Sequence, residues 1–168
     1  MLKKKARSAT EVLRKMYKPP LSVLDIGCRE GYSTKYMSKA GYDVTAIEID
    51  KKWARDGIII GDFLRHDFGR QFDIVFSRHS IEHILGNFLP KVYGLLVPDG
   101  ILFCVLPLQQ WAILNQGDDD EKDTITEEDA MTHMRSVSPF DEVCFAPTWK
   151  CGIKRMDNDY LYIGRKNG

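Results

Sequence analysis

The sequence has few cysteines, no long apolar run and no net charge, and each of these absences disfavours a class of protein. Its 168 residues include four cysteines but no C-x-x-C pair, which favours thiols in a reducing compartment over disulfides or a zinc knuckle. No apolar run approaches the roughly 18 residues of a membrane-spanning helix. The first residues, MLKKKARSATEV, lack the apolar core of a signal peptide. We therefore expect a cytoplasmic protein without a membrane partner.

The formal net charge of zero gives no indication of general polyanion binding, yet the charge is unevenly distributed. Residues 1–18 carry seven basic side chains and one acid, whereas residues 118–129 carry eight acids and one lysine. These segments are either two solvated surfaces or a basic helix and an acidic loop that meet over a site.

Apolar runs alternate with helical patterns along a chain whose length fits one domain with a full-sized core. Strands are predicted at residues 22–26, 43–49, 57–60, 72–77, 100–108, 141–149 and 159–166, and helices at 6–17, 32–40, 80–96 and 126–136. This alternation predicts an α/β fold, a doubly wound and mostly parallel seven-stranded sheet. We expect a single domain over 1–168, with an N-terminal helix within 1–20 and a candidate substrate-covering loop and helix at 109–135.

Glycines and an acid occupy the carboxyl ends of the first two predicted strands, where ligands bind in doubly wound sheets. Gly27 and Gly31 bracket a turn; glycine allows close backbone approach, and the amides of such a turn attract anionic or oxygen-rich groups. Glu48 ends the second strand, where a carboxylate can accept hydrogen bonds from both hydroxyls of a ribose. Together these residues predict a nucleoside-containing cofactor.

The turn itself indicates which nucleoside to expect. Its residues, Gly27-Cys28-Arg29-Glu30-Gly31, do not fit the dinucleotide fingerprint G-x-G-x-x-G. The stretch VLDIGCREG instead resembles the first motif, near D-x-G-x-G-x-G, of class I S-adenosylmethionine-dependent methyltransferases. VTAIEID, GDF, FDIVFSRHSIEHI and LLVPDGILFCVLP are similar, in order, to the motifs of their second to fifth strands. The resemblance runs from about residue 21 to 107 and is to the small-molecule branch.

The resemblance implies a Rossmann-like fold and methyl transfer from S-adenosylmethionine to a small-molecule acceptor. Asp25 would orient the ammonium end of the cofactor, Glu48 would hold the ribose, and Asp62 would face the adenine amino group. The cofactor-binding candidates are Asp25, Gly27, Cys28, Gly31, Glu48, Ile49, Asp62, Phe63 and Ser77. His79 is the candidate catalytic base, with a polar wall residue as its alternative. The compact chain implies a small substrate, or a second subunit or partner protein that completes the pocket.

Arg29 stands where the family pattern has its middle glycine. Its side chain either crowds the amino-acid end of the cofactor, projects outward or pairs with the cofactor carboxylate. Two other functions stay open, the first of them because of Arg29. One is a non-catalytic S-adenosylmethionine-binding module that serves a partner. The other is a nicotinamide-dependent oxidoreductase, which the missing fingerprint disfavours.

The stretch HSIEH, His79 to His83, also matches the inverted zinc-peptidase signature H-x-x-E-H. That signature needs both histidines on one helix, whereas His79 lies close to the end of the fourth strand, and no third ligand is identifiable. We therefore predict no metal. NPPY-type and PC signatures of nucleic-acid base methylation are absent after the fourth strand, which disfavours methylation of DNA or RNA bases. Ribose and other RNA positions stay open, although nucleic acid is not the expected partner.

Overall fold

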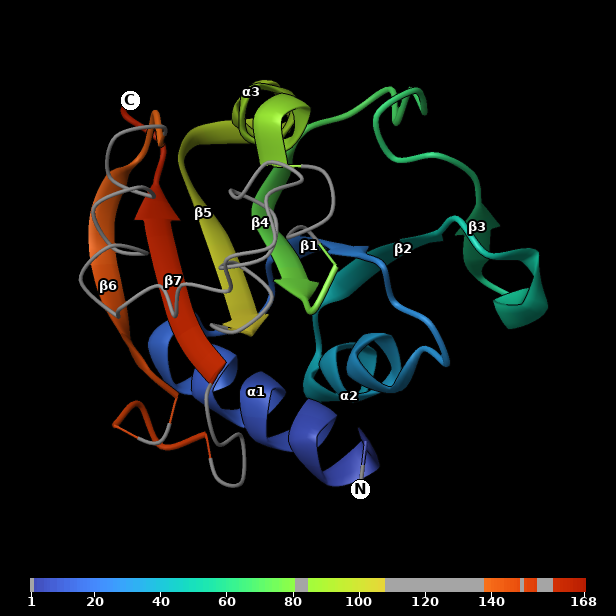
Figure 1. Cartoon of the computed structure of the whole chain (residues 1–168), viewed down its shortest axis with the longest axis horizontal. Coiled ribbons are helices and arrows are strands. Elements are labelled where there is room, and N and C mark those ends of the chain that lie inside the picture. Colours follow the sequence, from blue (N-terminus) through green and yellow to red (C-terminus); the bar gives the residue numbers. More distant parts are fainter. Residues whose placement is uncertain (1, 81–84, 108–137, 149, 154–158) are drawn as a thin grey trace, which may run out of the picture.

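A seven-stranded sheet forms the centre of the protein, with the strand order β3-β2-β1-β4-β5-β7-β6 (Figure 1). The computed structural model describes residues 2–80, 85–107, 138–148, 150–153 and 159–168. The strands are β1 (Ser22–Ile26), β2 (Asp43–Glu48), β3 (Ile58–Ile60), β4 (Phe72–Arg78), β5 (Leu96–Pro107), β6 (Asp141–Pro147) and β7 (Asp159–Arg165). β7 pairs antiparallel with β5 and β6, and β1 to β5 pair in parallel. The predicted doubly wound, mostly parallel sheet is therefore confirmed.

Helices cover both faces of the sheet (Figure 1). α1 (Leu2–Met16) and α2 (Tyr32–Ala40) lie on one face, and α3 (Leu85–Leu95) lies on the other. Successive strand residues point to opposite faces, so each strand supplies two cores. Val23 of β1 packs with residues of α1 and α2, whereas the next residue, Leu24, packs with residues of α3. No helix in the described ranges is long and apolar enough to cross a membrane.

Glycine sets both ends of α2. Gly31 precedes the helix with a φ of 67°, and Gly41 follows it with a φ of 101°. At the C-terminal end, the amide of Tyr42 donates to the carbonyl of Met37 at 3.2 Å, and the amide of Gly41 donates to Ser38 at 3.1 Å, which is the usual way a left-handed residue closes a helix. The helix therefore has the bounds that the sequence predicts, and its N-terminus adjoins the turn after β1.

Two predicted elements differ from the structure or lie outside it. β5 begins at Leu96 and not at the predicted residue 100. Asp99 has a φ of 61°, and the pairing with β4 shifts between Phe72 and Ile74, so the expected turn VPDG is accommodated inside the strand. The predicted helix at 126–136 and the candidate covering segment at 109–135 lie outside the described residues.

The parallel register brings the polar strand ends to one edge of the sheet. Ile26 at the end of β1 pairs with Ile47 of β2 and Ser77 of β4, and Glu48 pairs with Ile60 of β3. The residues that follow these strands therefore lie next to one another, although Gly27 in the turn after β1 and Ser80 after β4 are 53 residues apart in the sequence.

Candidate functional site

A cavity of about 570 Å³ lies beyond the carboxyl ends of β1, β2 and β3. Its volume falls within the range of small-molecule and cofactor sites. Six of the predicted site residues line it: Gly27, Glu48, Ile49, Asp62, Phe63 and His79. The structure therefore brings together residues from the turn after β1 and from the ends of β2, β3 and β4.

The turn after β1 approaches the end of β4 so closely that residue 27 has no room for a side chain. Gly27 has a φ of 67°, and a Cβ built on it would lie 2.1 Å from Oγ of Ser80. Its amide donates to the carbonyl of Ile47 at 2.9 Å, which fixes the turn to β2. Gly31, also at a φ of 67°, ends the turn. The two glycines thus have the conformational role predicted for them.

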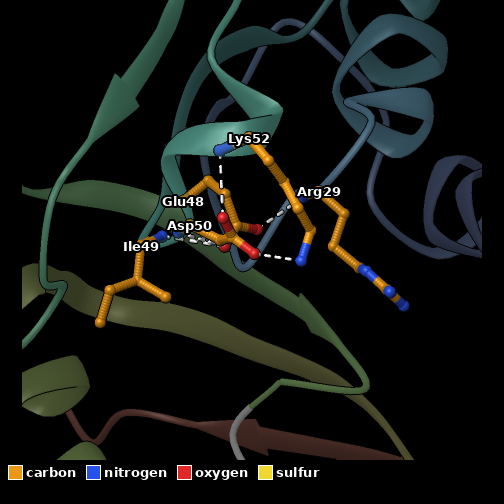
Figure 2. Close-up of polar contacts among 5 residues, drawn as sticks. All are labelled: Arg29, Glu48, Ile49, Asp50 and Lys52. Carbon is orange, nitrogen blue, oxygen red and sulfur yellow. Dashed lines mark hydrogen bonds and ion pairs between the residues drawn. The ribbon is translucent and has the colours of Figure 1, made fainter.

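Glu48 is buried at 6% exposure and accepts three backbone hydrogen bonds (Figure 2). Its Oε2 accepts from the amide of Arg29 at 2.8 Å, and its Oε1 accepts from the amides of Ile49 at 2.9 Å and Asp50 at 3.1 Å. The carboxylate therefore joins the turn after β1 to the end of β2. Because each carboxylate oxygen accepts up to two bonds, Oε2 retains a place for a further donor.

Arg29 has a φ of 47°, which is the conformation for which the family pattern has a glycine. Its side chain extends away from Glu48 (Figure 2), and its guanidinium lies 5.7 Å from the ring centroid of Trp53, in the short 3₁₀ helix η1 (Lys51–Trp53). Arg29 therefore forms part of the cavity wall and leaves the cavity open. The left-handed conformation costs a residue other than glycine about 1–2 kcal/mol.

Asp25 lies behind the turn and not on the cavity wall. It is 2% exposed and accepts a hydrogen bond from Oγ1 of Thr34 at 2.6 Å. Burial raises the pKa of the Asp25 carboxyl to about 6, although Thr34 and the positive charge of Arg78 oppose the shift. Asp25 could therefore affect a ligand only through the turn backbone or through neighbouring charges.

Cys28 is buried within the same turn. Burial, with the nearby charges of Asp25 and Glu48, raises the pKa of the Cys28 thiol to about 12. The thiol therefore stays protonated at neutral pH, which makes it a poor nucleophile. What Cys28 offers to a ligand is its backbone.

Another part of the cavity wall combines two apolar side chains, Ile49 and Phe63, with one acid, Asp62. Ile49 is 68% exposed and lines the cavity, whereas Phe63 is buried and packs on Phe88 with ring centroids 5.5 Å apart. Oδ1 of Asp62 accepts from the amide of Leu64 at 2.9 Å, so one carboxylate oxygen is already used in the loop. The other, Oδ2, lies 3.5 Å from Nε of Arg65 in an exposed ion pair.

The end of β4 places three consecutive polar residues in different surroundings. Ser77 is fully buried, does not line the cavity, and its Oγ has no hydrogen-bond partner among the described residues. Burial lowers the pKa of the Arg78 guanidinium, while the charges of Asp25 and Asp159 act in the opposite direction. His79 lines the cavity, and its Nε2 lies 2.9 Å from Oδ2 of Asp159.

Asp159, the partner of His79, is a residue that the sequence did not identify, as are Lys52, Trp53 and Ser80 of the cavity wall. Asp159 is the first residue of β7, is 6% exposed, and pairs in register with Pro107 at the end of β5. Because β7 is antiparallel, its first residue reaches the edge where the parallel strands end. The sequence does show an acid at the start of an apolar strand. It does not show that this acid meets His79, because that contact depends on the position of β7 in the sheet.

The zinc signature does not correspond to the geometry at its first histidine. His79 follows β4 in a bend with a φ of 55° and is not in a helix, whereas the signature places both histidines on one helix. His83 and Glu82 lie outside the described residues. Within the described part of the chain, no group of three or more potential ligands could hold a metal ion.

A family model described as "Methyltransferase domain" matches residues 2–145. The chain belongs to this methyltransferase family. The predicted methyltransferase family is thereby confirmed, which argues against the nicotinamide-dependent alternative. The Rossmann-like class I fold is confirmed by the sheet order and by the solved structures described below.

Curated relatives of this methyltransferase domain include an enzyme of Caulobacter vibrioides named ubiquinone biosynthesis O-methyltransferase. It is 34% identical over 99 residues, which cover 49% of this chain and 39% of that protein. A second enzyme of the same name, from Caulobacter sp., is 31% identical over 98 residues and is covered to the same extent. The matching region thus spans well under half the length of these relatives.

Solved structures share the fold over nearly the whole chain. The PH0226 protein of Pyrococcus horikoshii superposes with a TM-score of 0.72 at 17% identity, covering 95% of this chain and 88% of that one. The 1,6-didemethyltoxoflavin-N1-methyltransferase of Burkholderia thailandensis, solved with 1,6-didemethyltoxoflavin and S-adenosylhomocysteine, superposes with a TM-score of 0.65 at 20% identity, covering 98% and 79%. At these identities the likeness concerns the fold.

Proposed function

We propose that this protein transfers the methyl group of S-adenosylmethionine to a small-molecule acceptor. The observation that carries the proposal is the cavity beyond β1, β2 and β3, with Glu48 on its wall, in a chain of the methyltransferase family. The bound S-adenosylhomocysteine of the Burkholderia thailandensis structure and the name of the Caulobacter enzymes support the same donor and reaction type.

The residues around the cavity fit this cofactor. The missing side chain at Gly27 lets the turn backbone approach a ligand closely. The exposed side chain of Ile49 offers an apolar surface to an adenine ring, and Oε2 of Glu48 can accept a further hydrogen bond from a ribose hydroxyl. The buried carboxylate of Asp25 supplies negative charge behind the turn, which favours a ligand with an ammonium group.

In this arrangement Glu48 holds the ribose, Asp62 and the amide of Phe63 face the adenine edge, and the turn from Gly27 to Gly31 receives the amino-acid end. S-adenosylmethionine supplies an electrophilic methyl group on a sulfonium. Transfer is an in-line displacement, so alignment of donor and acceptor and exclusion of water can provide much of the rate. His79 lines the same cavity and is positioned to act as base on the acceptor.

The acceptor side of the pocket is the finer part of the proposal. We expect the segment 109–135, a second subunit or a partner protein to complete it, and we expect a small molecule and not a nucleic acid as substrate. A cytoplasmic location remains a prediction from the sequence.

Isothermal titration of the full chain with S-adenosylmethionine, S-adenosylhomocysteine and NAD tests the proposal. Binding of the first two compounds and not of NAD is expected. Tight binding of NAD alone would overturn the proposal. If the chain binds S-adenosylmethionine but transfers no methyl group to any of a broad set of small metabolites, it is a non-catalytic binding module.

A further inference from the structure

The contact between His79 and Asp159 determines how the histidine can act. Their side chains meet at 2.9 Å through Nε2 of the ring, and Asp159 is nearly buried, with 7% of its side chain exposed, against 29% for His79. A buried carboxylate accepts hydrogen bonds and does not donate them when ionised. Nε2 is therefore the nitrogen that carries the proton, and Nδ1 is left as the basic atom of the neutral ring.

The backbone fixes both partners at the edge of the sheet. The amide of His79 donates to the carbonyl of Val105 at 3.0 Å, which ties the bend after β4 to β5. The carbonyl of Asp159 accepts from the amide of Thr148 at 2.9 Å, and Asp159 pairs with Pro107. The two side chains thus come from ordered strand ends, which hold a contact more precisely than mobile loops do.

The charges around the pair form one connected group. Arg78 of β4 is attracted to Asp159 and to Asp25, the acid behind the turn after β1, and also to Glu30. The same residue therefore links the acid near the predicted amino-acid end of the cofactor to the acid that holds His79.

We propose that Asp159 is a positioning residue that fixes His79 with Nδ1 as the base, and that the acceptor is a group with a removable proton, such as a hydroxyl. The inference rests on the proposed function. A general base contributes only when the nucleophile must lose a proton, so a carboxylate-held histidine indicates a protic acceptor and not a tertiary amine or a thioether.

The transfer step is balanced without a further reagent. The acceptor proton passes to Nδ1 of His79 as the oxygen–carbon bond forms and the carbon–sulfur bond of the donor breaks. The electron pair of the broken bond stays on sulfur. The positive charge on the imidazolium is stabilised by Asp159, and the proton is later released to water.

The ring tautomer provides a test that needs no acceptor. In the chain labelled with ¹⁵N-histidine, long-range ¹H–¹⁵N spectra report which ring nitrogen carries the proton, and His79→Gln identifies the signal among the four histidines. We expect the Nε2–H tautomer alone in the wild type and in Asp159→Asn, whose amide oxygen can still accept. In Asp159→Ala we expect the Nδ1–H form to appear beside it, because no acceptor then selects Nε2–H. The Nδ1–H tautomer in the wild type, or no change in Asp159→Ala, would overturn the proposal.

Asp141→Ala is the matched control, because Asp141 is the exposed first residue of the neighbouring strand β6. This variant should leave the His79 signal unchanged. If Asp159→Ala does not fold, Asp159→Ser serves as the variant without a carboxylate or amide, and the comparison with Asp159→Asn still decides the outcome.

Methyl transfer from tritiated S-adenosylmethionine tests the acceptor class with catechol and N,N-dimethylaniline, an aromatic pair with and without a removable proton. We expect label on catechol alone. In Asp159→Ala, turnover of catechol should fall at least tenfold, but by no more than the roughly 10²–10⁴-fold that a general base supplies. The dissociation constant for S-adenosylmethionine should stay within twofold of the wild type. Label on N,N-dimethylaniline alone would refute the acceptor class. If neither probe is labelled, the tautomer measurement alone decides whether Asp159 fixes His79. Failure of S-adenosylmethionine to bind would instead refute the proposed function itself.

Discussion

The three hydrogen bonds of Glu48 permit a sharp prediction about stability and about binding. Replacing Glu48 with Gln keeps the shape of the side chain but changes one oxygen into an amide group. The favoured orientation keeps a carbonyl oxygen facing the amides of Ile49 and Asp50 and turns the new amide group toward the amide of Arg29. One charge-assisted bond, of 2.8 Å in the wild type, is then lost, and we expect a loss of about 1–3 kcal/mol in the free energy of unfolding.

Glu48→Ala removes all three acceptors, so its cost should be larger. The cavity lets water reach the exposed amides, and we therefore take the lower limit of about 1 kcal/mol for each unsatisfied donor, or about 3 kcal/mol in all. Glu11→Ala is the control, because Glu11 is an exposed α1 residue in an i,i+4 pair with Arg7, and its loss should cost less than about 0.5 kcal/mol. Urea denaturation of the ligand-free proteins measures all of these free energies.

The same variants separate the structural role of Glu48 from its proposed role in binding. Isothermal titration should show that S-adenosylmethionine binds Glu48→Ala about 1–3 kcal/mol more weakly than the wild type, or roughly 5- to 150-fold in the dissociation constant. An unfolding free energy equal to that of the wild type would refute the description of Glu48 as the acceptor that joins the turn to β2. An unchanged dissociation constant would remove Glu48 from the cofactor site.

Three further predictions concern the turn after β1. The pKa of Asp25 is raised to about 6 in the folded protein, against 3.8 in an exposed acid, so its contribution to stability is fully present below about pH 4 and is lost as the pH rises through 6. The free energy of unfolding of the wild type relative to Asp25→Asn should therefore fall by roughly 3 kcal/mol over that window. A difference between the two proteins that stays constant with pH in urea denaturation would contradict the burial of this carboxyl. Gly27→Ala should destabilise the fold more than Gly57→Ala, since both have positive φ but only a Cβ at Gly27 would meet Ser80; equal melting temperatures would contradict the close approach. Arg29→Gly should change the free energy of unfolding by less than about 1 kcal/mol, because relief of about 1–2 kcal/mol of backbone strain is offset by the conformational freedom of glycine in the unfolded chain. A more than tenfold gain in affinity for S-adenosylmethionine, measured by titration, would mean that Arg29 obstructs the site.

The sequence predicts the sheet and the identity of the strand ends because both depend on local patterns. Apolar runs define the strands, and the rule that ligands bind beyond parallel strand ends directs attention to Gly27, Glu48 and His79. The structure places all three on the cavity wall. These positions follow from residue order along each strand and do not require knowledge of distant contacts.

The sequence could not predict which strand-end side chains face the cavity and which lie behind it. Asp25 and Ser77 are both buried away from the wall, and Asp25 instead bonds to Thr34 of α2. The role of Asp159 depends on a contact 80 residues away in the sequence, and the bonds that already occupy Glu48 depend on the conformation of the turn. Such features come from tertiary geometry, which residue type and spacing alone do not specify.

The position of β7 between β5 and β6 has a consequence for how the protein forms during synthesis. β6 lies at the end of the sheet with β7 as its neighbour, so β6 has no place to dock until residues 159–165 have left the ribosome. Until then the nascent sheet ends at β5, a strand of twelve residues whose unpaired edge can attract other chains. The strand that covers this edge of β5 is thus the same strand that delivers Asp159 to His79.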